Sequence, residues 1–180
     1  MDEVGRGALA GPLVAAAVVL PEDFGHPLLR DSKRLSPAQR ERLTPLIRAA
    51  AIMVLVIEVS PAEIDRRGMG WANRAAFESL LAAAQADHYL IDGNLRLNSP
   101  KPHRCLIGGD GLIPAISAAS VVAKVHRDRL MVEMDRDFPA YQWGSNKGYG
   151  SAVHLAAIRD FGTTPQHRLS FLHQVETLPF

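Results

Sequence analysis

Short apolar runs alternate along the chain with segments whose apolar residues recur at helical spacing. Residues 12–20 form a continuous, Val-rich run that ends at Pro21, which is typical of a buried strand. A second run spans residues 52–57, and shorter runs at 89–91 and 105–107 predict two further strands. Because helical segments separate these strands, the pattern indicates an α/β fold, with a mixed central sheet flanked by helices.

Capping residues and spacing define the helices between these strands. Ser36 and Ser60 each precede a proline and have Gln or Glu three residues later, which is a helix-start signal. We expect a kink or break at Pro45, because proline removes a helical hydrogen bond. The expected helices cover residues 36–50, 60–68, 71–86, 114–137 and 151–161.

Bulk properties limit the class of protein. The 180 residues, of which 47% are hydrophobic, predict one ordered domain over residues 1–180. Neither a membrane-spanning run nor a secretory signal is visible, so we expect a cytoplasmic protein that does not bind membranes. The single Cys105 excludes an internal disulfide and a cysteine-based zinc site. A net charge of +1 argues against a uniformly basic surface but allows a local basic patch.

Acidic residues beside glycine mark three strand ends. They are Asp2 and Glu3 before Gly5, Asp92 before Gly93, and Asp110 between Gly109 and Gly111. Asp-Gly is also a common turn dipeptide, so each acid alone carries little weight. Ligands gather at strand ends in open α/β sheets, however, and carboxylates gathered there would favour Mg²⁺ or Mn²⁺ over zinc. Two such ions roughly 4 Å apart can clamp the attacking water and the leaving oxygen of a phosphodiester.

The first seven residues pose a geometric question. Neighbouring side chains on a strand point to opposite faces, so Asp2 and Glu3 cannot both reach one site in regular geometry. Glu3 must lie where the strand bends, reach the metal at a slant, or bind through its carbonyl. Gly5 and Gly7 allow positive φ angles and close approach to a ligand, and Arg6 offers a planar fork suited to a phosphate. Few residues precede Asp2, so we expect its strand to be clipped at the N-terminus.

Six motifs in order resemble the type 2 ribonuclease H (ribonuclease HII) family, and together they cover nearly the whole chain. They are Asp2 to Gly7 (DEVGRG); Asp31-Ser32-Lys33; Asp92-Gly93; Gly109-Asp110 with Ser117 to Ser120, Ala123-Lys124-Val125 and Arg127-Asp128; Lys147 to Gly150 with His154; and His167-Arg168 with Ser170-Phe171. Two departures stand out. Gly109 replaces a usual lysine, which removes a cation near the acids, and Ser151 replaces a usual threonine.

The resemblance implies a ribonuclease H-like fold with a C-terminal helical segment. It implies an endonuclease that cleaves RNA in RNA/DNA hybrids and incises 5′ to single ribonucleotides in duplex DNA, by a two-metal mechanism and with a role in ribonucleotide repair. The implied cofactor is Mn²⁺ or Mg²⁺. The implied partners are the nucleic acid and, as a candidate left open, a sliding clamp at the tail; we expect a monomer.

The resemblance also assigns site residues. Asp2, Glu3, Asp92 and Asp110 match the family's four catalytic, metal-binding acids. Gly5, Arg6 and Gly7 match the turn that senses a ribose 2′-hydroxyl, the group that distinguishes RNA from DNA, and Tyr149 matches a tyrosine that stacks on that sugar. Lys33, Lys147 and Arg168 are the implied phosphate contacts.

Other residues favour structural roles. We expect His154 to be a hydrogen-bonding residue of the fold, because no second histidine lies at i+4. His167 is left open between a phosphate contact and packing. Trp71, Trp143 and Cys105 are predicted to pack in the interior. Asp128 is predicted to form a helix-surface ion pair.

Two alternatives remain at the level of sequence. A related metal-dependent nuclease is one: a junction resolvase, which the Gly-Arg-Gly turn and Tyr149 argue against, or a type 3 ribonuclease H, which usually carries an extra N-terminal domain not visible here. The other is a decayed copy that binds hybrid duplexes without cleaving them. Turnover measured with the upstream strand residues restored separates the enzymes from the binding protein.

Overall fold

A computed structural model describes residues 1–22, 24, 26, 29 and 35–172. The strands are β1 (Asp2–Val4), β2 (Leu13–Val19), β3 (Met53–Val59), β4 (Tyr89–Asp92) and β5 (His103–Leu106). The helices are α1 (Pro37–Ala50), α2 (Pro61–Arg67), α3 (Met69–Ala83), α4 (Pro114–Asp137), α5 (Trp143–Asn146), α6 (Ala152–Phe161) and α7 (Leu169–Leu172), with 3₁₀ turns at Gly109–Gly111 and Pro139–Tyr141. The predicted strands and long helices are all present within a few residues of their expected bounds.

The strands form a mixed sheet system, as the sequence predicted. β1, β2 and β3 are antiparallel with β2 in the middle, and β4 and β5 form a parallel pair. Met1 joins the two sheets, because its nitrogen donates to the Leu90 carbonyl at 2.8 Å and its carbonyl accepts from the Asp92 amide at 3.0 Å. The β1 edge therefore lies directly beside the end of β4.

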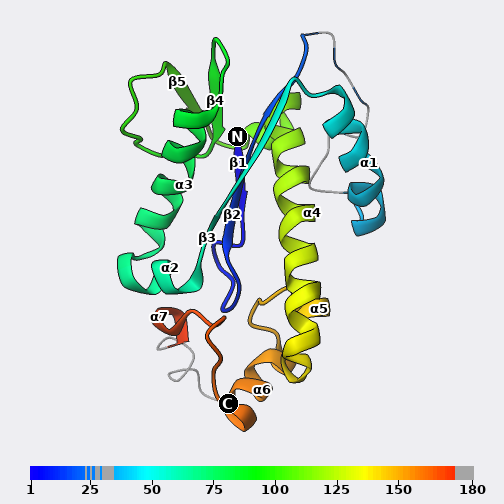
Figure 1. Cartoon of the computed structure of the whole chain (residues 1–180), viewed down its shortest axis with the longest axis vertical. Helices are drawn as coiled ribbons and strands as arrows, with labels where there is room; N and C mark the ends of the chain where they lie inside the picture. Colours follow the sequence, from blue (N-terminus) through cyan, green and yellow to red (C-terminus); the bar gives the residue numbers. More distant parts are fainter. Residues whose placement is uncertain (23, 25, 27–28, 30–34, 173–180) are drawn as a thin grey trace.

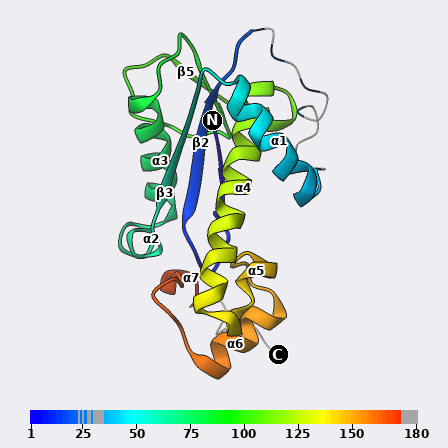
Figure 2. The same cartoon turned by 45° about the vertical axis from the view of Figure 1, so that its right-hand side comes forward.

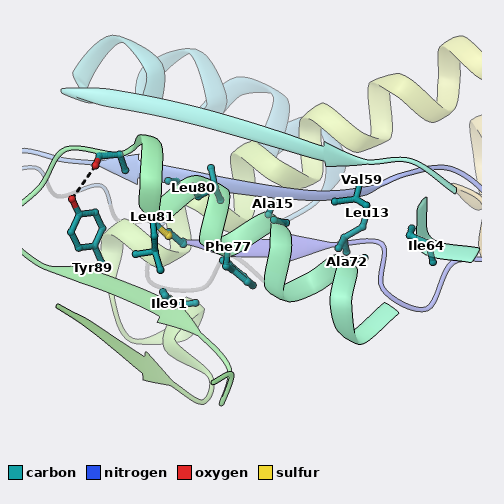
Figure 3. Packing of buried hydrophobic residues seen from close by; sticks show 14 residues of the cluster. Leu13, Ala15, Val59, Ile64, Ala72, Phe77, Leu80, Leu81, Tyr89 and Ile91 are labelled. Atoms are coloured by element: carbon teal, nitrogen blue, oxygen red, sulfur yellow. Dashed lines mark hydrogen bonds between the residues drawn. The ribbon is translucent and has the colours of Figure 1, made fainter. Parts of the chain in front are cut away.

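Alternating residues of β2 bury both faces of the antiparallel sheet. Val14, Ala16 and Val18 pack with α4 and α1, whereas Leu13, Ala15 and Ala17 pack with α3. Figure 1 shows α4 along one side of the strands and α3 along the other. The α3 side is an apolar core of Phe77, Leu80, Leu81 and Ile91, closed by a 2.9 Å hydrogen bond from the Tyr89 hydroxyl to the Ala84 carbonyl (Figure 3).

The first long helix, α1, runs without interruption through Pro45, so the expected break is wrong. Its start is fixed as predicted: the Ser36 hydroxyl accepts from the Gln39 amide, and the Gln39 side chain accepts from the Ser36 amide. Pro45 is exposed, while Leu43 and Ile47 on either side of it are buried. Burial of this face therefore outweighs the one hydrogen bond that proline removes.

Residues 139–172 form the expected C-terminal helical segment. α5, α6 and α7 gather at the far end of α4 (Figure 2). α5 and α6 pack in a cluster that includes Ala10, Met131, Tyr141 and Trp143. Ala10 of the loop after β1 belongs to this cluster, so the segment is tied to the start of the chain. No helix in the described ranges is long and apolar enough to cross a membrane.

Candidate active site

Asp2 and Glu3 lie on opposite faces of β1. Asp2 pairs with Ala16, which faces α4, and Glu3 pairs with Ala15, which faces α3. Ser120 of α4 lies near enough to Asp2 to lower the pKa of its carboxyl, which also accepts from the Glu3 amide at 2.8 Å. On the other face, the Glu3 carboxylate accepts from the Arg6 guanidinium at 3.4 Å. β1 therefore presents its two acids from the two sides of one sheet edge.

Asp92 and Asp110 approach that edge from the neighbouring sheet. Asp92 ends β4, next to Met1, and its carboxylate accepts from the Gly109 amide at 2.7 Å. Asp110 follows Gly109 in the turn before α4 and is 3% exposed. The structure thus gathers the three predicted acid–glycine segments at one place, although they are far apart along the chain.

The acids influence one another electrostatically. Burial raises the pKa of Asp2 to about 7; the Ser120 hydrogen bond opposes this shift, and the neighbouring charges of Glu3 and Asp92 add to it. Burial also raises the pKa of Glu3, with Arg6 opposing and Asp92 adding to the shift. Partly buried carboxylates that repel one another are suited to a divalent cation, which removes both penalties.

The chemistry of this donor set fits Mg²⁺ or Mn²⁺, because it consists of hard carboxylate oxygens without a cysteine or histidine. Among the described residues, no three acidic, histidine or cysteine side chains already lie in a metal-binding arrangement. The role of each acid as a ligand therefore remains a prediction.

The turn after β1 is shaped by a buried arginine. Gly5 has a φ of +90°, and a side-chain carbon there would lie 2.2 Å from Nε of Arg127. Only glycine fits this position. Gly7, by contrast, is exposed and has open space around it, and it does not use the positive φ that glycine allows. Arg6 between them is exposed and free to meet a ligand, apart from its contact with Glu3.

Two fully buried arginines donate hydrogen bonds to the backbone of this turn and of the loop that follows it. Arg168 donates to the carbonyls of Gly5, Arg6 and Gly11 at 2.6–3.1 Å. Arg127 donates to the carbonyls of Pro12, Lys147 and Ala10 at 2.8–2.9 Å. Both are 0% exposed. The predicted phosphate contact of Arg168 is therefore wrong, because its guanidinium is sequestered among backbone carbonyls.

Sequence reasoning did not single out Arg127 as a functional residue. The available signal was helical periodicity, because Arg127 follows buried Ala123 by four residues and precedes buried Met131 by four. Its charged neighbours Asp128 and Arg129 concealed that position. Burial lowers the pKa of Arg168 to about 9, and the nearby Arg127 charge adds to this shift. Two positive charges therefore lie beneath the Gly5–Gly7 turn.

The loop that carries Tyr149 is attached to the same turn. The Gly148 carbonyl accepts from the amides of Leu9 and Ala10 at 2.8 and 3.1 Å. Gly148 has a φ of +78°, and a side-chain carbon there would lie 2.4 Å from the Ala10 carbonyl oxygen. Tyr149 is 37% exposed, with its ring centroid 5.5 Å from the Arg127 guanidinium carbon. The Gly-Arg-Gly and Lys-Gly-Tyr-Gly motifs thus form one unit.

His154 and His167 hold the Tyr149 loop against the C-terminal segment. His154 Nδ1 donates to the Tyr149 carbonyl at 2.9 Å, and its Nε2 accepts from Trp143 Nε1 at 3.0 Å and lies 3.1 Å from His167 Nε2. His167 Nδ1 accepts from the Thr164 amide at 2.9 Å. His154 is thus a structural hydrogen-bonding residue, as predicted, and the open question at His167 is settled in favour of packing.

This pair should make stability fall with acid. Burial, and then the charge of His154, lowers the pKa of His167 from 6.5 to about 4, so the folded state binds fewer protons than the unfolded state between those values. Stability present above pH 6.5 is therefore lost as the pH falls toward 4, by on the order of 2 kcal/mol. Urea unfolding at pH 7 and pH 4.5 measures this loss.

The matched variant is His167→Gln, whose amide keeps hydrogen-bonding groups but does not titrate. We expect its loss of stability between the two pH values to be clearly smaller than that of the wild type. An equal loss in both proteins would show that the acid sensitivity arises elsewhere.

Lysine positions divide between described and undescribed parts of the chain. Lys33, with Asp31 and Ser32, lies outside the described residues. Lys147 is half-buried, and its ammonium group contacts the Gly144 carbonyl. It borders a groove of about 590 Å³ between α1, α4 and α5, which none of the four acids lines; the groove also contains Arg40, Arg129 and Arg136 among its lining residues.

The remaining predictions concern packing. Trp143 is fully buried, and its ring stacks on Tyr141 with centroids 5.2 Å apart. Trp71 is half-buried beneath the Arg67 guanidinium. Asp128 forms the expected helix ion pair, with Lys124 at 2.6 Å. Cys105 is partly buried against the α3-side core.

Comparison with known proteins adds to this geometry. Residues 1–174 match the family model described as Ribonuclease HII. A Ribonuclease HII from Porphyromonas gingivalis is 48% identical over 176 residues, which cover 94% of this chain and 86% of that protein.

Solved structures give the same result for the fold. The ribonuclease HII of Archaeoglobus fulgidus, solved in complex with PCNA, has a TM-score of 0.83 at 23% identity and covers 96% of this chain and 92% of its own. Bst-RNase HIII, solved in complex with Mn²⁺, has a TM-score of 0.69 at 19% identity and covers 97% of this chain and 67% of its own. The type 3 enzymes thus share the fold, whereas the family model and the 48% identical relative are type 2.

Proposed function

Because the chain belongs to the ribonuclease HII family, endonucleases that act on RNA in RNA/DNA hybrids, we propose that its acid edge hydrolyses the phosphodiester 5′ to a ribonucleotide, single embedded ones included. The observation that carries this proposal is the 3.4 Å contact between Glu3 and Arg6. It joins the acids to the Gly5–Gly7 turn, so a ribose on the turn would place its phosphate beside the carboxylates.

Asp2, Glu3, Asp92 and Asp110 are the residues proposed to hold Mg²⁺ or Mn²⁺. Two divalent ions, when bound, supply a water of lowered pKa and stabilise the charge that develops on the leaving oxygen. The chain itself supplies orientation. The Glu3 amide donates to the Asp2 carboxylate at 2.8 Å and the Gly109 amide to that of Asp92 at 2.7 Å, so fewer side-chain rotations remain to be fixed at the moment of reaction.

Discrimination of RNA from DNA is assigned to the turn and Tyr149. A 2′-hydroxyl both donates and accepts hydrogen bonds, and a rigid backbone turn can satisfy it only in one position. Arg127 and Arg168 make the turn rigid by binding five different backbone carbonyls of residues 5–12, and their two charges favour a phosphate above it. Tyr149 is exposed enough to pack on the sugar.

The nucleic-acid backbone is expected to continue across Lys147. The groove beside it contains three arginines as well as Glu41, Asp128 and Glu133, and Arg129 is paired with Glu41. This mixed lining suits a limited number of phosphate contacts rather than a strong non-specific site. Lys33 and a sliding clamp remain proposed contacts; the clamp is proposed because the A. fulgidus relative was solved with PCNA.

A duplex DNA with one embedded ribonucleotide tests the proposal. With Mn²⁺ or Mg²⁺ we expect a single incision on the 5′ side of the ribonucleotide, and Tyr149→Ala should lower kcat/KM by about 10-fold, because it removes the stacking surface. The product is read on a sequencing gel. The control duplexes carry deoxyribose or 2′-O-methyl ribose at the same position. If the enzyme cuts either control as fast as the duplex with the ribonucleotide, the proposed discrimination is refuted.

A further inference from the structure

One buried polar side chain beside the acids has no assigned role. Asn73 lies on the inner face of α3 and is 1% exposed, in a helix whose other buried residues are all apolar: Ala72, Ala76, Phe77, Leu80 and Leu81. Such a position normally holds an apolar residue, because a buried amide loses its hydrogen bonds to water. A polar residue here therefore requires a compensating contact.

The structure leaves that contact incomplete. Within the described residues, neither the nitrogen nor the oxygen of the Asn73 carboxamide makes a hydrogen bond of normal geometry. Burial and the charge of Asp92 raise the pKa of Glu3, and Asn73 opposes this shift together with Arg6, whose effect is larger. The carboxamide is thus close enough to act on Glu3 without being fully bonded to it.

The direction of approach follows from the register of β1. Glu3 pairs with Ala15, whose side chain packs in the α3-side core together with Ala72 and Ala76. Glu3 therefore leaves the strand on the α3 side, where Asn73 lies, while Asp2 leaves it toward Ser120 of α4. Each acid of the pair has a polar side chain on its own face of the sheet: a hydroxyl for Asp2 and a carboxamide for Glu3.

We propose that Asn73 is a positioning residue that directs the Glu3 carboxylate from the α3 face to the shared edge with Asp92 and Asp110. In the proposed arrangement the Asn73 amide, which has no partner of normal geometry in the structure, shifts to donate to one Glu3 oxygen and leaves the other for a cation. This resolves the geometric problem of two adjacent acids on one strand, because Glu3 reaches the site at a slant with Asn73 fixing its angle. The proposal rests on the proposed metal-dependent hydrolysis.

The test compares Asn73→Leu, which keeps the shape and removes the hydrogen bonds, with the wild type. Three results are expected. Without divalent metal the melting temperature rises by about 2–4 °C, because an incompletely bonded amide leaves the core. Mn²⁺ affinity, measured by titration calorimetry without substrate, falls by about 10-fold, and kcat falls by a similar factor with KM unchanged.

A double-mutant cycle with Glu3→Gln shows whether Asn73 acts through Glu3. In the Glu3→Gln background, Asn73→Leu should cause no further loss of Mn²⁺ affinity. Asn73→Ala, which leaves a smaller side chain, should repeat the loss of affinity whatever its effect on stability. It serves as the second variant if the leucine is poorly accommodated.

The outcomes separate this proposal from the one on which it rests. If Glu3→Gln lowers Mn²⁺ affinity and turnover while Asn73→Leu and Asn73→Ala change neither, Asn73 does not position Glu3 and only the present inference fails. The same conclusion follows if the losses of Mn²⁺ affinity caused by Asn73→Leu and by Glu3→Gln simply add in the double variant. If Glu3→Gln itself leaves metal affinity and turnover unchanged, the proposed role of Glu3 in hydrolysis fails.

Discussion

The Asp92→Asn variant is expected to cleave an RNA/DNA hybrid on the order of 10²–10³-fold more slowly than the wild type while keeping its fold. Asp92 ends β4, where its carboxylate accepts from the Gly109 amide at 2.7 Å. An asparagine oxygen can accept the same bond, so the turn before α4 should persist. What the variant loses is one negative charge at the edge shared with Asp2 and Glu3, and with it the attraction for a divalent ion.

Single-turnover cleavage with saturating hybrid measures the loss, and circular dichroism with thermal melting checks the fold. Asp87→Asn is the matched control, because it makes the same chemical change at an exposed position just before β4. We expect the control to cleave at the wild-type rate. If the Asp92→Asn variant cleaves within threefold of the wild-type rate, Asp92 does not take part in the proposed chemistry.

The second large effect is expected from Arg168→Leu, which should lower the free energy of unfolding by about 3–5 kcal/mol. The arginine satisfies the carbonyls of Gly5, Arg6 and Gly11 while fully buried. Leucine fills part of the space but removes the guanidinium donor from all three carbonyls, of which Gly5 keeps only a 3.4 Å bond from the Ala8 amide. The hydrogen bonds that connect residue 168 with the Gly5–Gly7 turn would be lost.

Urea or thermal unfolding measures this loss, which corresponds to a fall in melting temperature of roughly 10 °C. Arg136→Leu, at an exposed position near the end of α4, is the control and should stay within about 0.5 kcal/mol of the wild type. If Arg168→Leu has the melting temperature of the wild type and loses only affinity for nucleic acid, then Arg168 contacts phosphate and its structural role is wrong.

Local sequence signals were sufficient for most of the elements. The run at residues 12–20 and the serine caps at Ser36, Ser60 and Ser151 depend on neighbouring residues only, and the structure places β2, α1, α2 and α6 accordingly. Pro45 is the exception, because the burial that carries α1 through it comes from contacts with α4 and the sheet. A short stretch of neighbouring residues in the sequence does not reveal such tertiary contacts.

The site was only partly predictable for a related reason. A motif shows which residue types occur together but not whether a side chain faces solvent. Arg168 therefore looked like a phosphate contact although it is sequestered among carbonyls, and Arg127 was missed although the spacing of Ala123 and Met131 placed it on the buried face of α4. Asn73 belongs to none of the motifs, and its position beside Glu3 follows only from the register of β1, which sets the side of the sheet that Glu3 faces.

The convergence of Asp2, Asp92 and Asp110 on divalent ions is tested most directly by a crystal grown with Mn²⁺ and examined by anomalous scattering. The account predicts manganese at the β1 edge, coordinated directly by carboxylate oxygens of all three residues, with Glu3 reaching the same site from the α3 side. Manganese bound elsewhere, or carboxylates of these residues that share no ion, would contradict it.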